Sequence, residues 1–430
     1  MSLSRRRLLT GAASLAAASR ALDAAVLPAT SSVISQGRVR TLNGSSLPWR
    51  MVNGVKEFQL VAGEFEHEFA PGCKARCWGY NGSTPGPTIE AVEGDRVRIL
   101  ITNTLPEGTS IHWHGILLPN GMDGISGLNQ EPIAPGETWA YEFTLRQEGT
   151  YLYHPHVDEM TQLAFGMMGF FIVHPRVPHD PPVQRDYAML LHNWALHPGT
   201  YRPDPSVMTE FDLWTFNSKV FPATEPLLAA QGERVRLRVA NLSMHHHPIH
   251  LHGHRFAVTG GDGGRWPRQA WLPEVTTIVG VGQTRDIEFV ADNPGDWALH
   301  CHLSHHTMNA MGHGIANSVG VKMEGLETRI RKQLPGFMAM GEDGMQQHLE
   351  HAQHMRGPEN TLPMAQGEGP FGAIGMGGMM TMLKVRRGLQ GNVDPGWYEV
   401  KDVPRARRVD TASPAAPKDQ DAPEHHQHAE

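Results

Sequence analysis

An internal repeat limits what this chain can fold into more than any other feature of its sequence. Three segments recur in the same order. EGDRVRILITNTL (93–105) recurs as QGERVRLRVANLS (231–243) and IHWHG (111–115) recurs as IHLHG (249–253), both at an offset of 138 residues. Residues 134–156 recur as residues 279–302. Solenoid repeats are much shorter than this period. The repeat therefore predicts two duplicated domains within the 430 residues.

Both copies carry the sequence pattern of β-strands. Short runs such as RVRILIT and RVRLRVA alternate polar with apolar residues, and Gly, Pro and Asn separate the runs. Alternation with a period of two is typical of antiparallel strands in a β-sandwich. We therefore predict an all-β fold, with one sandwich over about 50–178 and a second over about 179–324 whose first strand is DYAMLLHNWAL.

The extension over 325–430 departs from this pattern. Its Gly- and Met-rich segment at 369–388 ends in a possible strand, and the polar, Pro-rich residues from Asp410 predict a disordered end. Thioethers suit Cu(I), but irregular spacing favours packing against the body of the protein for most of these methionines. They are Met338, Met340, Met345, Met355, Met376, Met379, Met380 and Met382.

The N-terminal residues 1–30 read as an export signal. The segment SRRRLL at 4–9 resembles the twin-arginine signal, and the Ala/Leu stretch after it is too short for a permanent membrane anchor. A basic tail is the alternative. We predict a soluble periplasmic or secreted protein that is exported folded. The net charge of −7 gives no reason to expect nucleic-acid binding.

Two cysteines, Cys73 and Cys77, leave two possibilities open. Export would allow a disulfide to persist, but on an extended strand these residues would lie too far apart, so pairing requires a turn. The alternative is a pair of free, half-buried thiols.

The 26 histidines include four His-x-His pairs at matched places in the two copies. Residues two apart on a strand face the same side, so each pair presents two imidazoles together. Clustered imidazoles without a metal would repel one another when protonated. The pattern therefore predicts a multinuclear metal site built from His112, His114, His154, His156, His250, His252, His300 and His302.

The second copy adds a thiol. Cys301 lies between His300 and His302, where the first copy has Pro155. Two imidazoles, a thiolate and a weak axial thioether form a blue-copper site, and the available residues are His247, Cys301, His306 and Met311. Because Cys301 faces the opposite side of the strand from its neighbours, it would connect a single-electron site to the multinuclear site.

The motifs HWHG, HPH, HPIHLHGH and HCHLSHHTMNAM, spread over about 90–315, resemble those of the multicopper oxidases, which include laccases and copper-resistance oxidases. The resemblance implies two tandem cupredoxin Greek-key sandwiches and four coppers per subunit. By position, the type 2 ligands match His112 and His250; the type 3 ligands match His114, His154, His156, His252, His300 and His302; and the type 1 ligands match His247, Cys301 and His306, with Met311 axial.

The spacing of the motifs leaves no room for the middle domain of a three-domain laccase, because only 91 residues separate His156 from His247. The resemblance then implies the two-domain type, with type 1 copper in the C-terminal domain. Members of that type are homotrimers whose trinuclear clusters lie between domain one of one subunit and domain two of the next.

The same resemblance implies an oxidase. It would take single electrons near an exposed His306, pass them through Cys301 and reduce O2 to water, with phenols and aromatic amines or, alternatively, Cu(I) as substrate. Asp123 matches a carboxylate that supplies protons, although a turn Asp is the alternative; Asp158 is a second candidate, and Thr307 stands where some relatives have Glu. Pro155 stands where a copper nitrite reductase would need a cysteine in its first domain, so this class of enzyme is excluded. A non-catalytic copper carrier is a further alternative, but it has no need of a cysteine such as Cys301 between two metal-binding histidines.

Overall fold

The structure is a computed structural model. It describes residues 39–309, 325, 328, 329, 332, 359–362, 367–399 and 404–408. The predicted export signal, Met311 and the predicted disordered end from Asp410 lie outside the described residues. In the described part, no helix is long and apolar enough to cross a membrane.

The first sandwich consists of two sheets that enclose a common apolar core. One sheet has the order β2-β3-β6-β8, with β4 paired to β3, and the other has the order β5-β10-β9-β7. The strands are β2 (Trp49–Val52), β3 (Val55–Ala70), β4 (Cys73–Tyr80), β5 (Gly86–Val92), β6 (Arg96–Asn103), β7 (His112–His114), β8 (Thr138–Thr144), β9 (Gly149–His154) and β10 (Gly169–His174). Helix α1 (Glu159–Ala164) and the 3-10 turn η1 (Asn120–Met122) complete it.

The second sandwich repeats this plan. Its larger sheet has the order β1-β11-β14-β20-β16-β17, with β12 on β11 and β18 on β16, and its smaller sheet has the order β13-β24-β21-β15-β19. The elements are β1 (Arg40–Thr41), β11 (Arg185–Trp194), β12 (Leu213–Phe216), β13 (Leu227–Ala230), β14 (Arg234–Asn241), β15 (His247–Leu251), β16 (Phe256–Gly261), β17 (Gly264–Arg265), η2 (Arg268–Ala270), β18 (Leu272–Glu274), β19 (Thr276–Val279), β20 (Thr284–Val290), β21 (Gly295–Cys301), η3 (Ser304–Thr307) and β24 (Met380–Arg386). A separate two-stranded ribbon contains β22 (Glu368–Gly369) and β23 (Gly372–Ala373).

The prediction of an all-β fold from a duplicated sequence is confirmed. The recurring segments form matching strands, β6 with β14, β7 with β15, β8 with β20 and β9 with β21. Along β6 the side chains alternate between buried and more exposed positions, as a strand with one face in a core requires. The run DYAMLLHNWAL forms most of β11, as expected.

A third apolar cluster joins the two sandwiches. Every residue of β10 is buried, because one face of this strand lies in the first core and the other lies against the second sandwich. Phe170 and Ile172 on that outer face share a cluster with Leu190 on β11 and Ala240 on β14. A buried polar contact adds to it, since Thr150 Oγ1 donates a hydrogen bond to Asp286 Oδ1 at 2.7 Å.

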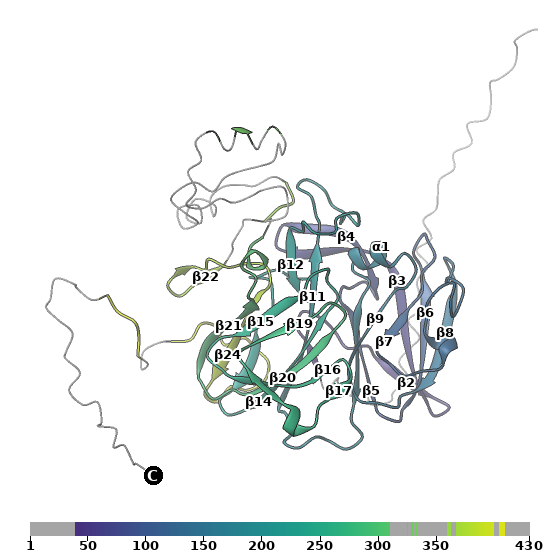
Figure 1. The fold of residues 1–430 in the computed structure, drawn as a ribbon, viewed down its shortest axis with the longest axis horizontal. Helices are drawn as coiled ribbons and strands as arrows, with labels where there is room; N and C mark the ends of the chain where they lie inside the picture. The colour runs from purple at the N-terminus through teal and green to yellow at the C-terminus, as the bar shows by residue number, and fades with distance from the viewer. Residues whose placement is uncertain are drawn as a thin grey trace, which may run out of the picture. The chain divides into compact units, whose positions relative to one another are not determined.

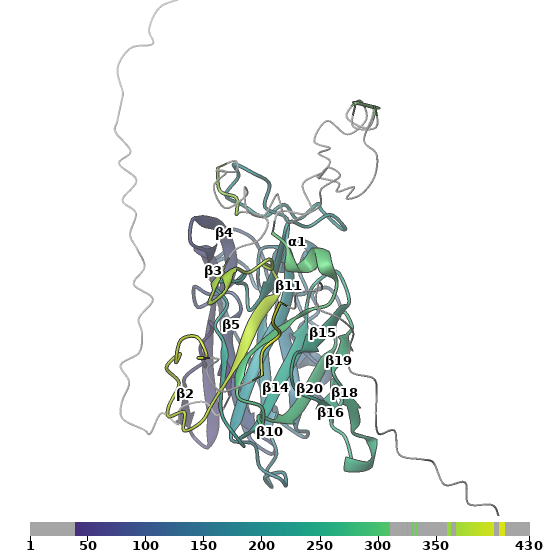
Figure 2. The same ribbon diagram turned by 90° about the vertical axis from the view of Figure 1, so that its left-hand side faces the viewer.

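The predicted strand in the C-terminal extension exists and belongs to the second sandwich. Strand β24 pairs in parallel with β13 and antiparallel with β21, and Leu383 and Val385 enter the second core. Figures 1 and 2 show this yellow strand among the green strands that precede it by many residues. The extension therefore supplies a central strand next to the one that ends in Cys301.

The structure decides between the two possibilities for Cys73 and Cys77. Both lie on β4, which is a regular strand rather than a turn, and both are buried free thiols. Burial raises the pKa of Cys73 to about 12, so this thiol stays protonated at neutral pH.

Candidate metal centres

The side chains of His247, Cys301 and His306 meet in the second sandwich, and we call this group the cysteine site. The two Nδ1 atoms are 3.1 Å apart, and each lies 3.5 Å from Cys301 Sγ. All three residues are 0% exposed. Such a triangle is small enough for one ion to reach all three atoms at bond lengths of about 2.0–2.3 Å.

Three elements bring these residues together. Strand β15 begins at His247, and η3 holds His306 just after the end of β21 at Cys301. The other ring nitrogen of His247, Nε2, lies 2.7 Å from Ser243 Oγ, which itself donates to Asn241 Oδ1 at 2.8 Å. A hydrogen bond at Nε2 leaves the lone pair of Nδ1 free to face the site.

Burial keeps the cysteine site uncharged when no cation is present. Desolvation lowers the pKa of His247 to about 3 and that of His306 to about 2, and it raises the pKa of Cys301 to about 12. A bound cation makes the thiolate the favoured form of Cys301, because metal ions bind the thiolate and release its proton. The site is thus a neutral N2S donor set, the type that suits copper.

The first-sandwich histidines form a second group, the first quartet: His112, His114, His154 and His156. His112 pairs with His154 across strands β7 and β9, and the ring of His112 lies 5.3 Å from that of His154 and 5.5 Å from that of His156. His114 Nδ1 lies 3.3 Å from His154 Nε2. Three of these side chains, those of His112, His114 and His154, have ligand atoms close enough for one ion.

The second sandwich carries an equivalent group, the second quartet: His250, His252, His300 and His302. His250 pairs with His300 across β15 and β21, with ring centroids 5.6 Å apart, and the ring of His302 lies 5.5 Å from that of His250. His252 Nε2 lies 3.1 Å from His300 Nε2. The cross-strand ring spacing of the first quartet is therefore matched in the second, at 5.3 Å and 5.6 Å.

Backbone carbonyls orient the matched rings in the same way. His154 Nδ1 donates to the Pro155 carbonyl at 3.0 Å, and His300 Nδ1 donates to the Cys301 carbonyl at 2.8 Å. His112 Nδ1 donates to the Asp123 carbonyl at 2.9 Å. In each ring this proton on Nδ1 leaves the lone pair of Nε2 to face the quartet, which is how proteins orient imidazole ligands.

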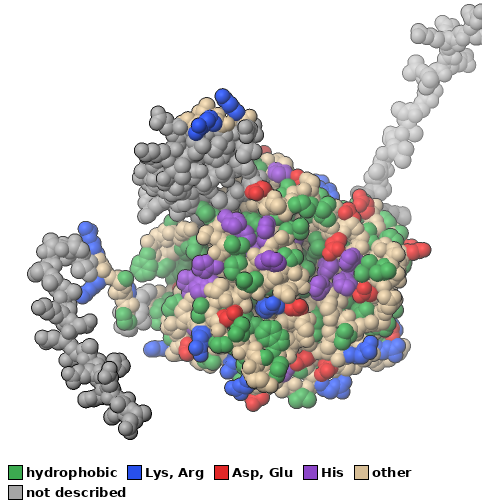
Figure 3. Space-filling view, viewed as in Figure 1, with side chains coloured by type: hydrophobic (Ala, Val, Ile, Leu, Met, Phe, Trp, Pro, Cys, Tyr) green, Lys and Arg blue, Asp and Glu red, His purple; other side chains and the backbone are tan. Residues whose placement is uncertain are grey.

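The two quartets do not meet within one chain. Among the described residues, each ring contact or hydrogen bond between quartet histidines joins members of the same quartet. The part of the second sandwich that approaches His114 is the turn at Gly282, whose backbone bonds to this imidazole. On the face of the molecule shown in Figure 3, histidine side chains gather in several separate patches.

Comparison with known proteins agrees with this geometry. Two family models, both described as multicopper oxidase, match residues 63–178 and 197–320, together more than half of the chain. The chain belongs to the multicopper oxidase family. Copper is therefore the metal that the family implies, and the buried N2S donor set fits it.

The chain is similar to both copper-resistance proteins and laccases. It is 38% identical over 139 residues to a copper resistance protein A homolog of Pseudomonas syringae pv. tomato, and 31% identical over 271 residues to Laccase-2 of Botryotinia fuckeliana. These matches cover 32% and 54% of this chain, but only 23% and 44% of the relatives, so the chain spans less than half of their length.

A solved structure shares the fold. The blue copper oxidase from Nitrosomonas europaea superposes with a TM-score of 0.57 at 27% identity, over 76% of this chain and 85% of that one.

The expectation that His306 is exposed was wrong for this member of the family. The residue is 0% exposed, because η3 tucks its imidazole beneath the indole of Trp214. No sequence motif marks Trp214, which lies on β12 more than 80 residues before His306. Sequence reasoning missed it because the contact is made only by the tertiary structure.

Carboxylates lie beside the first quartet. Asp123 Oδ1 is 3.4 Å from His112 Nδ1. Asp158 is exposed and precedes α1, whereas the next residue, Glu159, places its carboxylate 3.6 Å from His154 and 3.5 Å from His156. The sequence pointed to Asp158; the helical turn that starts there presents Glu159 instead.

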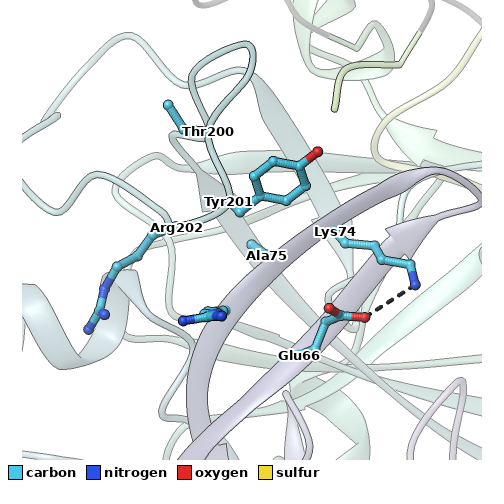
Figure 4. Close-up of a pocket in the computed structure, with 7 residues that line it drawn as sticks. Glu66, Lys74, Ala75, Thr200, Tyr201 and Arg202 are labelled. Atoms are coloured by element: carbon cyan, nitrogen blue, oxygen red, sulfur yellow. Dashed lines mark hydrogen bonds and ion pairs between the residues drawn. The ribbon is translucent and has the colours of Figure 1, made fainter. Parts of the chain in front are cut away.

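A separate cavity of about 520 Å³ lies where β3 and β4 meet the loop around Tyr201. Lys74 and Glu66 form an ion pair at its rim (Figure 4). Arg202 packs against the rings of Trp78 and Phe165 beside it. None of its lining residues is a histidine or a cysteine, so the cavity is not part of the metal centres.

Proposed function

We propose that this protein is an oxidase that couples one-electron oxidation of a reducing substrate to the four-electron reduction of O2 to water. The observation that carries the proposal is Cys301, which completes the buried cysteine site while both of its chain neighbours, His300 and His302, belong to the second quartet. One residue of backbone thus links a one-electron site to a multinuclear one.

The ligand sets follow from the three groups of side chains. The cysteine site would hold one copper, with Met311 as an axial ligand. The quartets would hold three more, one between His112 and His250 and two among the other six histidines. Bound copper would supply the redox chemistry, while the carbonyl bonds at Nδ1 orient the rings and the surrounding core excludes water.

A complete multinuclear site requires a second copy of the chain. Each quartet offers four imidazoles, and the two lie on different parts of one chain, with Gly282 rather than a second-quartet histidine beside His114. A closed ring of chains brings the first quartet of one copy to the second quartet of the next. We therefore propose a homotrimer with a trinuclear cluster at each subunit interface.

Proton supply is the role that we propose for Asp123. Reduction of O2 to water consumes four protons for every four electrons, so a carboxyl group near the cluster is needed. Asp123 touches His112 through its backbone carbonyl at 2.9 Å and approaches it through its carboxylate at 3.4 Å. The side chain can therefore deliver protons while the main chain fixes the ring.

Phenols and aromatic amines are the substrates that we propose first, and Cu(I) is the second candidate. Similarity to a relative named for copper resistance favours Cu(I). The thioether of Met244, which is 52% exposed, stands next to His245 and His246 on the loop that leads to His247.

We also propose export by the twin-arginine route, which cell fractionation with an Arg5,Arg6 double substitution to Lys would test.

Oxygen uptake by the copper-loaded protein tests the function directly. A phenol and Cu(I) are offered separately while dissolved O2 and hydrogen peroxide are followed. Uptake without peroxide supports four-electron reduction, and the faster donor identifies the substrate class. Full copper loading without uptake from either donor would rule out the oxidase and favour a copper carrier.

A further inference from the structure

The imidazole of His306 is held differently from other rings of the metal centres. His247 has a hydrogen-bond partner at Nε2, the nitrogen that does not face the cysteine site, and His154 and His300 donate from Nδ1 to backbone carbonyls. In the part of the chain that the structure describes, His306 Nε2 has no hydrogen-bond partner. The described residues therefore orient this ring by some other contact.

The main chain of His306 is fixed, but this alone leaves its ring free to turn. The N–H of His306 donates to the Leu303 carbonyl at 2.8 Å, and its carbonyl accepts from the N–H of Met379 at 2.9 Å. The torsion about the Cβ–Cγ bond of a histidine has broad energy wells. Because the lone pair of Nδ1 lies in the ring plane, rotation about this bond would turn it away from Cys301 Sγ, 3.5 Å away.

A flat aromatic contact restricts that rotation. The indole of Trp214 stacks on the imidazole of His306, with ring centroids 3.5 Å apart and planes 17° from parallel. This spacing is that of atoms in van der Waals contact. Tilting the imidazole would push its edge into the indole, so the stack holds the imidazole in the one plane that contains the Nδ1 lone pair.

Trp214 is itself fixed in place. Strand β12 pairs with β11 in the register Asn193 to Trp214, which fixes the backbone. Phe211 and His305 meet the indole edge-on, at 5.8 Å in both cases, a favourable arrangement for aromatic rings. The indole Nε1 is buried and has no hydrogen-bond partner among the described residues, so the contact with His306 uses the face of the indole and not its N–H.

We propose that Trp214 is the positioning residue of His306, and that its ring face does for this imidazole what hydrogen bonds do for the others. The inference rests on copper binding at the cysteine site, which is part of the proposed function. Trp214 acts only through the imidazole that it stacks on. The need is geometric, because side chains that bind a metal have to be held within about 0.5 Å and about 10–20° of their productive positions.

The test separates a flat ring from apolar bulk at position 214. Trp214→Phe keeps an aromatic face, whereas Trp214→Leu keeps an apolar side chain without one. Trp194→Leu is the matched control, because Trp194 is also buried and lies on the adjacent strand β11, with its ring against Phe69 and His192. Titration with copper against a competing chelator, followed through the blue absorption, gives the affinity of the cysteine site. The same spectra give the width of the blue band.

We expect Trp214→Leu to lower the copper affinity of the cysteine site by about ten- to hundredfold, the usual effect of removing a group that orients a metal ligand. The blue band should also broaden, because the imidazole then adopts several planes. Trp214→Phe should stay close to wild type in both measurements. Trp194→Leu should lower the stability of the fold and change neither the affinity nor the band.

Three results would overturn the inference: wild-type affinity and band width in Trp214→Leu, an equal loss in Trp214→Phe, or an equal loss in Trp194→Leu. If Trp214→Leu does not fold, Trp214→Met replaces it as the apolar side chain without a flat face. A blue wild-type protein that takes up no oxygen would remove the proposed oxidase but not this inference, which the same titrations still decide. A copper-loaded wild-type protein without blue absorption would remove both.

Discussion

Cys301 is the residue on which the proposed chemistry depends most. Replacing it with Ser removes the thiolate donor of the cysteine site and substitutes a hydroxyl that stays protonated. We expect Cys301→Ser to lose the blue absorption and about one copper per chain, and to lose oxygen uptake, while the fold remains. Visible absorption spectroscopy measures the loss of the blue absorption, and metal analysis measures the copper content per chain. Cys77→Ser is the matched control, since Cys77 is also a buried free thiol; equal losses in both variants would contradict a specific role for Cys301.

Asp123 provides the second prediction at the scale of single residues. Asn keeps the shape and the backbone carbonyl that binds His112 but cannot deliver a proton. We expect Asp123→Asn to lower kcat by about 10²- to 10⁴-fold, the usual range for general acid–base catalysis, with copper content unchanged. Asp158→Asn should retain activity, because Asp158 is exposed and lies outside the ring contacts. Full turnover by copper-loaded Asp123→Asn would leave Asp123 as a turn residue only.

At the scale of elements, β24 shows how a distant segment supports the site. Leu383 is 0% exposed in the second core, and β24 lies beside β21. Leu383→Ala should lower the free energy of unfolding by about 2–5 kcal/mol, as large-to-small changes in a core do. Val393→Ala is the control, because Val393 is 79% exposed. Urea denaturation of the copper-free proteins measures the free energy of unfolding of both variants. Equal values for the two would mean that β24 adds little to this core.

The contact between β3 and the loop after β12 predicts a pH dependence. His67 Nε2 donates to the Ser218 carbonyl at 2.6 Å, and burial lowers the pKa of His67 from 6.5 to about 4. Between pH 6.5 and 4 the unfolded chain therefore binds a proton that the folded chain does not, so stability falls as the pH falls.

Proton binding by His67 in the unfolded chain leaves the free energy of unfolding unchanged above pH 6.5 and lowers it progressively below that, by about 3 kcal/mol near pH 4. To isolate the effect of His67 on stability, we would measure the free energy of unfolding of wild type and of His67→Gln, both without copper, from pH 4 to pH 7.5. The difference between the two proteins should change with pH over this interval. A constant difference would show that His67 does not titrate as inferred.

At the scale of the whole molecule, the separation of the quartets predicts complementation between defective chains. His112→Ala damages the first quartet and His250→Ala the second, so neither variant alone should form a complete cluster. In a random mixture, about one quarter of interfaces in a closed ring pair two undamaged quartets, and activity should return to that fraction. Sedimentation establishes the trimer. An inactive mixture of trimers, or an active monomer, would contradict clusters at subunit interfaces.

The sequence by itself determined the features that are encoded in contiguous residues. The offset repeat predicted two sandwiches because alternation is a local property of strands, and β6 and β14 confirm it. The His-x-His spacing predicted which imidazoles share a face, and the order His300–Cys301–His302 predicted that the thiol turns away from them, toward His247 and His306. Met311 stays a prediction, because it lies outside the described residues.

Only the tertiary structure decided which distant segments meet. It placed β24 between β13 and β21, laid Trp214 on His306, and brought Glu159 rather than Asp158 to the first quartet. These contacts join residues that are far apart in the sequence and share no local pattern. They form because folding buries apolar surface and packs the interior closely, which brings distant segments together. Motif spacing therefore predicted the ligands, whereas long-range packing determined how accessible they are.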